Sequence, residues 1–409
     1  MRGKLPKEWP TVSQPVDSVL LEDETWKRVD KATGGAAAPC FQCGVCTAIC
    51  PWGLVKEETI SIRKIVRQAQ LGLPGWSDGL WLCTTCLWCE SRCPHEVDIT
   101  KAILGLRRLA WKERQVPPGL PTLLWNIYFD GNAWGRPPSE RPLWAKGMAV
   151  KEFSPEDEIL LYVGDDAAYD RRVQKVARAL VSLLEAAGVT FGTLGEREPS
   201  SGDPVRSVGH EEYLAEIIDA NARLFQETGV KTMVTISPHC YDMFANRYPN
   251  LSGDFRPLHY SQYLLELIED ERLKFENELP LKVTYHDPCY LSRRNGICDE
   301  PRQVLRSIPG LQLVEMERSG PDTLCCGGGG GRMWMETAGG ERFSDLRMRE
   351  AAETGAEVVV TCCPHCLSCL EASLSVVGRS KLRVMDLAEV AHLALQSRAA
   401  TSDVASRRP

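Results

Sequence analysis

Eight of the seventeen cysteines fall into two copies of one spacing pattern. The copies are Cys40-x2-Cys43-x2-Cys46-x3-Cys50-Pro51 and Cys83-x2-Cys86-x2-Cys89-x3-Cys93-Pro94. This spacing is typical of [4Fe–4S] cubanes, because three thiolates on one tight loop reach three irons and the fourth ligates the other cluster. The sequence therefore predicts one cubane on Cys40, Cys43, Cys46 and Cys93, and a second on Cys83, Cys86, Cys89 and Cys50.

Structural zinc is the alternative occupant of these thiolates. Zinc sites usually combine paired C-x2-C knuckles with a long spacer. A repeated three-plus-one spacing that ends in Cys-Pro favours iron–sulfur clusters instead. We therefore expect a protein that moves single electrons.

Length, composition and charge limit the class of protein. The chain has 409 residues, 43% of them hydrophobic and 25% charged, which suits two or three globular domains. A formal charge of -7 argues against a nucleic-acid partner. Many cysteines, without an export signal in residues 1–10, indicate a reducing compartment. No apolar run approaches the ~18 residues that span a bilayer. We expect a cytoplasmic protein that reaches a membrane only through a partner subunit.

Composition and hydrophobic pattern divide the chain into six segments. They are a polar leader (1–39), a ferredoxin-like module (40–114), an ordered Pro- and Trp-rich linker (115–158), two α/β repeats (159–280 and 281–398) and a flexible tail (399–409). Helical spacing of apolar residues predicts helices at 60–69 and 97–111 in the module. The tryptophans of the linker are expected to pack against the next domain.

The two repeats share the order and spacing of their motifs. Strands at 159–163 and 233–237 of the first repeat correspond to 282–285 and 359–362 of the second. The intervals between corresponding turn motifs are 34 and 35 residues in the first repeat, and 35 and 36 in the second. Helical patterns, such as 173–187 and 212–227, lie between the strands. Alternating strands and helices predict parallel α/β units.

Five further cysteines lie in three turns of the second repeat, and we expect them to meet at the carboxyl ends of strands. They are Cys289, Cys325, Cys326, Cys363 and Cys366. The glycines at 327–331 allow a backbone or substrate to come close. A phosphate-binding loop is the alternative for this glycine run, but no Gly-Lys-Ser/Thr follows it and no strand leads into it.

These motifs resemble the CCG domain of the B-type and D-type subunits of heterodisulfide reductase. A two-cluster ferredoxin module followed by two CCG repeats is similar to the D-type subunit, to the iron–sulfur subunit of glycolate oxidase and to the heterodisulfide reductase-like subunits of sulfate-reducer membrane complexes. The resemblance covers about residues 40–395. It implies that Cys289, Cys325, Cys326, Cys363 and Cys366 hold a non-cubane [4Fe–4S] cluster at which disulfides are reduced or thiols oxidised. We expect no flavin on this chain.

The first repeat departs from the family pattern. It has Asp165, Ser200, Ser201 and Ser237 in place of cysteines, and only Cys240 remains. Serine and aspartate are poor substitutes for soft thiolate ligands. We therefore expect the first repeat to be a scaffold with degenerate ligands and no cluster. Authentic heterodisulfide cleavage, which would use two special clusters, is then in doubt.

Two histidines lie inside the ligand turns of the second repeat. His286 and His365 are candidates for hydrogen bonding to cluster sulfur or for passing a proton to a thiolate. His239, the counterpart of His365 in the degenerate repeat, favours a structural role for this turn histidine instead. The cysteines left over, Cys298, Cys362 and Cys369, are expected to pack as small apolar side chains.

We therefore expect an α/β electron-transfer subunit of a heterodisulfide reductase-like complex, with two cubanes passing electrons to or from the CCG cluster. The resemblance implies as partners a flavoprotein (an electron-transfer flavoprotein or a reductase-like flavin subunit), a membrane cytochrome b with a quinone pool, or further reductase-like subunits. The alternative is a catalytic subunit that reduces a disulfide or oxidises thiols. Catalysis predicts an open approach to the CCG cysteines, whereas a relay predicts a protected cluster.

Overall fold

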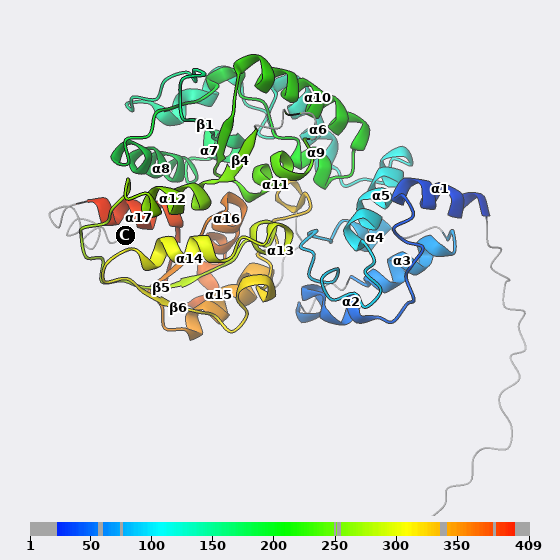
Figure 1. Ribbon diagram of the computed structural model, residues 1–409. Coiled ribbons are helices and arrows are strands. Elements are labelled where there is room, and N and C mark those ends of the chain that lie inside the picture. Colours follow the sequence, from blue (N-terminus) through cyan, green and yellow to red (C-terminus); the bar gives the residue numbers. More distant parts are fainter. Residues whose placement is uncertain are drawn as a thin grey trace, which may run out of the picture.

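The structure is a computed structural model that describes residues 23–55, 60–73, 77–248, 251, 255–335, 342–378 and 382–396. Residues 1–22 of the predicted leader and the predicted tail at 399–409 lie outside the described residues. Figure 1 shows a helical module beside two α/β repeats, which lie one above the other. The fold is therefore mixed α/β with a helical module at its N-terminal side.

The module consists of short helices around two cysteine loops. The helices are α1 (Asp23–Thr33), α2 (Val45–Ile49), α3 (Ile62–Gln70), α4 (Ser77–Leu80) and α5 (Ile99–Lys112), with a 3-10 turn η1 (Pro51–Leu54). Ser61 caps α3 and Asp98 caps α5 by accepting backbone N–H groups of the first turn. Residues 23–33, which the sequence pattern places in the leader, form α1. This helix packs against α5, and its Val29 is buried in the same hydrophobic cluster as Ile103 and Leu106 of α5.

The predicted linker contains helix α6 (Gly119–Asp130) and a 3-10 helix η2 (Pro138–Ala145). Trp144 is buried in the main core, and Trp134 donates its indole N–H to Asp166. Both contacts tie the segment to the first repeat. Trp125 differs from the expectation, because 59% of it is exposed beside the exposed rings of Tyr128 and Phe129.

The first repeat is built on a parallel sheet with strand order β2-β1-β3-β4. Its strands are β1 (Ile159–Tyr162), β2 (Phe191–Gly192), β3 (Thr232–Thr235) and β4 (Arg256–His259). The helices are α7 (Gly164–Tyr169), α8 (Gln174–Ala186), α9 (Asp203–Ser207), α10 (Glu211–Thr228), α11 (Pro238–Asn246) and α12 (Tyr260–Glu269), with η3 (Gly195–Arg197). The central strands β1 and β3 are almost completely buried, as expected for a sheet covered on both faces.

The second repeat has the corresponding strand order, β6-β5-β7-β8, and is also parallel. Its strands are β5 (Lys282–Tyr285), β6 (Gln312–Val314), β7 (Val358–Thr361) and β8 (Arg383–Asp386). The helices are α13 (Cys289–Asn295), α14 (Asp299–Arg306), α15 (Phe343–Glu353), α16 (Pro364–Ala372) and α17 (Leu387–Leu395), with η4 (Gly320–Asp322), η5 (Arg332–Trp334) and η6 (Leu374–Val377). The same topology in both repeats agrees with the duplication seen in the sequence.

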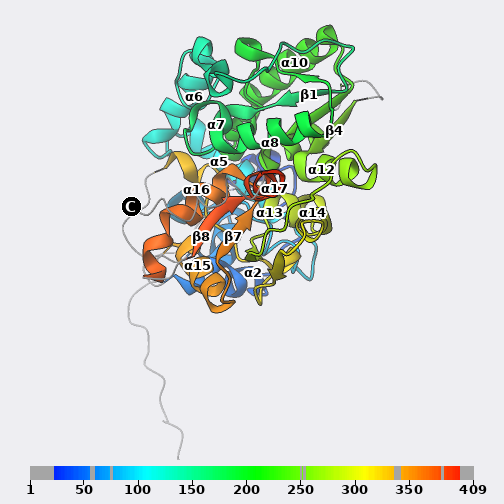
Figure 2. The ribbon, with the colours of Figure 1, turned by 90° about the vertical axis from the view of Figure 1, so that its left-hand side faces the viewer.

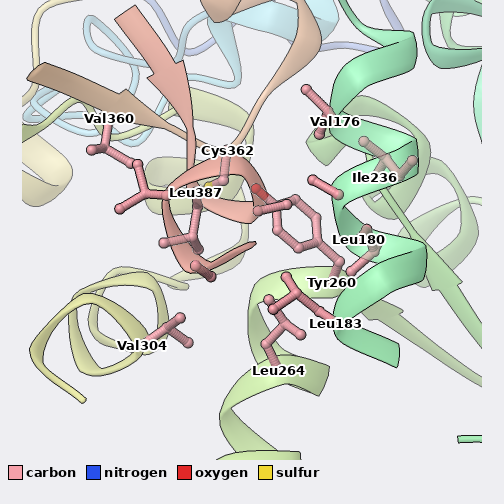
Figure 3. Close-up of a cluster of buried hydrophobic side chains, with 14 of the residues drawn as sticks. Val176, Leu180, Leu183, Ile236, Tyr260, Leu264, Val304, Val360, Cys362 and Leu387 are labelled. Carbon is pink, nitrogen blue, oxygen red and sulfur yellow. The ribbon is translucent and has the colours of Figure 1, made fainter. Parts of the chain in front are cut away.

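The two repeats share one hydrophobic core. Helix α8 of the first packs against α17 of the second, and α12 packs against α14, as Figure 2 also shows. Side chains from both repeats meet in this layer, including Leu180, Leu264 and Leu387 (Figure 3). Because apolar surface of both repeats is buried in one cluster, the repeats hold each other in a fixed orientation.

Candidate metal centres

The first thiol group lies in the helical module. The thiols of Cys40, Cys43, Cys46 and Cys93 line one small cavity, which the ring of Phe41 also borders. The loop is held in place because Gln70 donates its amide to the carbonyls of Ala37 and Cys40, at 3.1 and 3.0 Å. The structure thus brings Cys93 from the second cysteine loop to the first, which is the exchange that the spacing predicts.

The second thiol group contains Cys50 from the first loop and Cys83, Cys86 and Cys89 from the second. Burial raises the pKa of the Cys50 thiol, and the nearby thiols of Cys86 and Cys83 raise it further. The pKa of Cys89 is raised in the same way, by burial and by the thiols of Cys83, Cys86 and Cys50. Four soft donors that raise one another's pKa in this way suit a cation that binds thiolates. That these residues ligate iron stays a prediction.

The third thiol group lies where the parallel strands β5 and β7 end, at the point where the strand order of the sheet reverses. The Sγ atoms of Cys326 and Cys366 are 3.3 Å apart. The pKa of Cys325 is raised by the adjacent thiols of Cys289 and Cys326, and that of Cys366 by burial and by the thiols of Cys326 and Cys363. All five cysteines are buried. The predicted set is therefore brought together, and its sulfur donors fit an iron–sulfur cluster; their role as ligands stays a prediction.

The second and third thiol groups touch across the boundary between the module and the second repeat. The thiols of Cys86 and Cys325 lie close enough for each to shift the pKa of the other. The glycine run makes this contact possible, because a Cβ atom on Gly329 or Gly330 would lie 2.4 or 2.3 Å from the backbone oxygens of Thr84 and Cys83. Glycine is required here so that two backbones can approach closely.

Arg107 connects all three parts of the chain at this boundary. Its side chain is completely buried, and it donates to the carbonyls of Leu80, Cys83, Ser207 and Gly330. Burial lowers the pKa of Arg107 to about 10. The guanidinium places a positive charge beside Cys83, where thiolates would bring negative charge.

His286 lies beside the third thiol group. One of its ring nitrogens and the thiols of Cys326 and Cys366 lie within 4.8 Å of one another. Arg347 donates to Nδ1 of His286 at 3.1 Å, so the ring proton lies on Nε2. Burial lowers the pKa of His286 well below its usual value, and the Arg347 and Arg293 cations lower it further. Nε2 is buried and has no hydrogen-bond partner among the described residues. The predicted role in hydrogen bonding to sulfur is therefore geometrically open to it.

His365 reaches out of the second repeat toward the first. Its Nε2 lies 3.0 Å from Oδ2 of Asp166, which follows β1. Burial alone would raise the pKa of Asp166, but His365 and the indole of Trp134 lower it overall. His365 is thus held by a carboxylate of the opposite repeat, and a role for it in proton transfer stays a prediction.

The corresponding turns of the first repeat hold a network of polar contacts. Arg141 binds Asp165 at 2.5 Å and Glu198 at 2.9 Å, and all three side chains are nearly buried. Ser237 accepts the backbone N–H of His239, and Ser201 accepts that of Asp203. Cys240 is buried beside Ser201.

His239 is a functional candidate to which the sequence pattern assigns only a structural role. Its Nδ1 lies 3.0 Å from Asp203, and its ring lies close enough to Cys363 to share in setting its pKa. Burial would lower the pKa of His239, but the Asp203 carboxylate and the hydrogen bond to Cys363 raise it well above its usual value. The shared Pro-His-Cys sequence of both turns is the signal that points to it, since two equivalent turns of a duplicated fold can face each other.

The leftover cysteines have different surroundings. Cys362 is buried in the main core and hydrogen-bonds to Tyr285 at 2.8 Å, which fits the expected packing role. Cys298 is half-buried at the start of α14. Cys369 packs against the third thiol group and contacts Met333. It also lines a cavity of about 310 Å³ that reaches Cys326.

The sequence matches two domain families. Residues 166–245 and 283–371 match the cysteine-rich domain CCG, and residues 36–97 match the 4Fe-4S dicluster domain. The fold and the thiol groups therefore define a CCG-domain iron–sulfur protein. As the motifs predict, the chain is similar to the D-type subunit of heterodisulfide reductase. It is 26% identical over 360 residues to that subunit of the dihydromethanophenazine:CoB–CoM heterodisulfide reductase of Methanosarcina barkeri, covering 80% of this chain and 86% of that one.

Longer bacterial relatives are more similar in sequence. A probable iron–sulfur-binding oxidoreductase, FadF, of Bacillus subtilis is 39% identical, covering 71% of this chain and 43% of that protein. The EtfAB:quinone oxidoreductase of Syntrophomonas wolfei is 34% identical, covering 78% and 47%. This chain thus spans about half the length of these two relatives. A hypothetical protein from Helicobacter pylori shares the fold, with a TM-score of 0.53 and 11% identity over 92% of this chain and 73% of that one. Among the described residues, no helix is long and apolar enough to cross a bilayer.

Proposed function

We propose that this chain is the iron–sulfur electron-transfer subunit of a heterodisulfide reductase-like oxidoreductase complex. The observation that carries the proposal is the contact between Cys86 and Cys325, which joins the thiol groups of the module to that of the second repeat. Cys89 lies close enough to Cys46 to be influenced by its charge, so the first and second groups also adjoin. Three neighbouring groups in this order suit single-electron transfer, which iron–sulfur clusters supply when bound.

The proposed ligands follow the three groups. Cys40, Cys43, Cys46 and Cys93 would hold the first cubane, and Cys83, Cys86, Cys89 and Cys50 the second. Cys289, Cys325, Cys326, Cys363 and Cys366 would hold a [4Fe–4S] cluster of the non-cubane type. We propose no cluster in the first repeat, because Asp165 is engaged by Arg141 and the remaining ligand positions are serines with one cysteine.

Burial of the third thiol group favours an electron relay over direct chemistry on a substrate. All five of its cysteines are buried. The alternative is a disulfide reductase or thiol oxidase at this site. The cavity that reaches Cys326 and is lined by Arg332 and Arg342 supports it. A disulfide with anionic groups would suit these cations.

We propose that the partners are a flavoprotein, of the electron-transfer flavoprotein or reductase-like kind, and a membrane cytochrome b with its quinone pool, or other reductase-like subunits. The name of the Syntrophomonas wolfei relative, which pairs EtfAB with quinone, supports this choice. A relative from Chromohalobacter salexigens, 33% identical over 88% of this chain, is named a probable membrane-anchored ferredoxin. We propose that this chain works on the cytoplasmic side and meets a membrane through a partner.

The test is iron and sulfide analysis of the anaerobic protein, combined with EPR spectroscopy with and without added thiols. Three four-iron clusters predict roughly twelve iron atoms per chain. Cys325→Ser should remove the third signal, while Cys298→Ser, which lies outside all three groups, should leave every signal intact. A relay predicts that thiols do not change the third signal, whereas a thiol-sensitive signal would favour the disulfide chemistry. Roughly eight iron atoms in the wild type would contradict the third site.

A further inference from the structure

The turn histidine of the first repeat contacts a cysteine of the second. His239 begins the α11 helix with Pro238, and its ring lies close enough to Cys363, which precedes α16, for the two side chains to influence each other's pKa. Its ring stacks on Tyr290 with 3.8 Å between centroids, and its side chain is almost fully buried. The repeat without a complete thiol set therefore provides one wall of the third thiol group.

A carboxylate fixes the orientation of this histidine. Asp203 lies 3.0 Å from Nδ1 of His239, and the same carboxylate binds Arg206 at 2.7 Å. Because Nδ1 faces Asp203, Nε2 is the ring nitrogen left to face Cys363. Asp203 and Arg206 are both buried, so solvent does not compete for the ring. Tyr290 on one face and Asp203 at the edge leave the imidazole a single direction in which to point.

Both partners of the imidazole accept hydrogen bonds when the site is loaded. A carboxylate only accepts, and a cysteine that ligates metal does so as a thiolate. An N–H on Nε2 can then donate to the Cys363 sulfur. A hydrogen bond donated to a ligand sulfur favours the reduced, more negative state of an iron–sulfur cluster.

We propose that His239 and Asp203 are positioning residues of the third site: Asp203 orients His239, and His239 donates a hydrogen bond to the Cys363 thiolate that raises the reduction potential there. The inference rests on the proposed function, because it concerns the cluster that Cys363 would hold. It assigns the degenerate repeat a part in setting the potential at the end of the electron path.

The duplicated sequence supports this assignment. Asp203 occupies the position that Gly328 has in the second repeat, three residues after the first cysteine or serine of the pair. A Cβ atom added to Gly328 would lie 3.3 Å from the Cβ atom of His365, whereas the carboxylate of Asp203 reaches the ring of His239. The exchange of glycine for a carboxylate therefore adds an orienting group to the turn histidine of the repeat that has lost its thiols.

The experiment is a redox titration of the anaerobic, iron-loaded protein, followed by the EPR signal that Cys325→Ser removes. His239→Ala should make the midpoint potential of this signal more negative, and the other two signals should keep theirs. A tenfold change in the ratio of reduced to oxidised site corresponds to about 59 mV for a one-electron couple. His239→Gln keeps an N–H near the position of Nε2 but carries no charge, so it should shift the midpoint in the same direction by a smaller amount.

The control is His392→Gln, the same substitution at a half-buried histidine of α17 that hydrogen-bonds to Gln396. It should leave all midpoints unchanged. An unshifted third signal in His239→Ala would overturn the proposal. If His239→Ala loses iron, the midpoint of His239→Gln decides: a negative shift supports the proposal and a wild-type value overturns it. Roughly eight iron atoms in the wild type would instead show that the proposed function itself had failed.

Discussion

Arginine side chains bring positive charge to the thiol groups at the residue scale. Arg107 donates to four carbonyl oxygens, and Arg293 donates to the carbonyl of Cys86 at 2.6 Å. Arginine suits such positions because its planar fork donates several hydrogen bonds and stays protonated even when buried. These cations compensate for burying several thiolates close together, which would otherwise cost free energy.

The buried carboxyl of Asp386 allows the effect of burial on a pKa to be tested at a single residue. Its carboxyl caps α17 and accepts the hydroxyl of Tyr260 at 2.6 Å, and burial raises its pKa to about 8. A carboxyl whose pKa rises on folding stabilises the folded state fully below its unfolded pKa of about 4. This contribution is lost as the pH increases toward 8, by about 1.4 kcal/mol per pH unit.

We therefore expect Asp386→Asn to remove this part of the pH dependence. Between about pH 6 and about pH 8, the thermal midpoint of the wild type should fall relative to that of the variant. Circular dichroism under anaerobic conditions measures both midpoints. The same substitution at exposed Asp270 should leave the difference constant. Parallel pH profiles of Asp386→Asn and the wild type would contradict the raised pKa.

At the scale of elements, the glycine run at 327–331 allows the second repeat to approach the module closely. Gly330 has a positive φ of 61°, and an added Cβ would lie 2.3 Å from the Cys83 oxygen, which belongs to another part of the fold. Gly296 has a similar φ of 70° at the end of α13, but nothing lies within 4 Å of the position that a Cβ would take there. The two glycines thus separate the cost of backbone conformation from the cost of a clash.

We expect Gly296→Ala to cost about 1 kcal/mol, because it meets only the left-handed backbone penalty. Gly330→Ala should cost about 1–3 kcal/mol more, since the backbones must move apart. It should also slow electron transfer between the module and the second repeat, because the contact of Cys86 with Cys325 is widened. Thermal midpoints and the rate at which the third EPR signal appears after reduction measure both effects. Equal behaviour of the two variants would show that the close approach is unimportant.

Local patterns in the sequence predict the elements that carry the site, but not how distant elements meet. Strand β5 occupies the predicted residues 282–285, and β7 lies one residue from its predicted position. Cysteine spacing predicts which thiols gather, because each set depends on one fold unit with known spacing. Hydrophobic periodicity does not predict the proximity of His239 to Cys363, which joins the two repeats; only the shared Pro-His-Cys sequence of the two turns points to it. Helix α1 is also not predicted. Its sequence is mostly polar, and the few residues that are buried against the module give no helical pattern of apolar residues.

The whole molecule presents the first thiol group to solvent on a basic surface. Cys43 is exposed, and Phe41 beside it is 75% exposed and stacked on His95. The exposed face of α3 next to these rings carries Arg63, Lys64 and Arg67, which line the same groove as Cys40 and Phe41. A basic face on a chain with a net charge of -7 differs from the rest of the surface. On the proposed function, this basic face suits an electron-transfer partner with acidic groups.

Charge reversal on α3 tests this electron entrance. The triple variant with Arg63, Lys64 and Arg67 changed to Glu should accept electrons from an acidic flavodoxin at least about tenfold more slowly, because steering by complementary charge raises association rates by about 10–1000-fold. The effect should fade with added salt, since the Debye length falls to ~10 Å at about 0.1 M. Stopped-flow reduction at low and high ionic strength measures this effect.

A control triple variant, with Lys231, Lys274 and Arg383 changed to Glu, changes the net charge equally at exposed positions of the two repeats. If both triples slow reduction alike, net charge governs the encounter and the α3 face is not the entrance. If only the α3 triple does so, electrons pass first to the thiol group beneath Phe41 and then inward along the three groups.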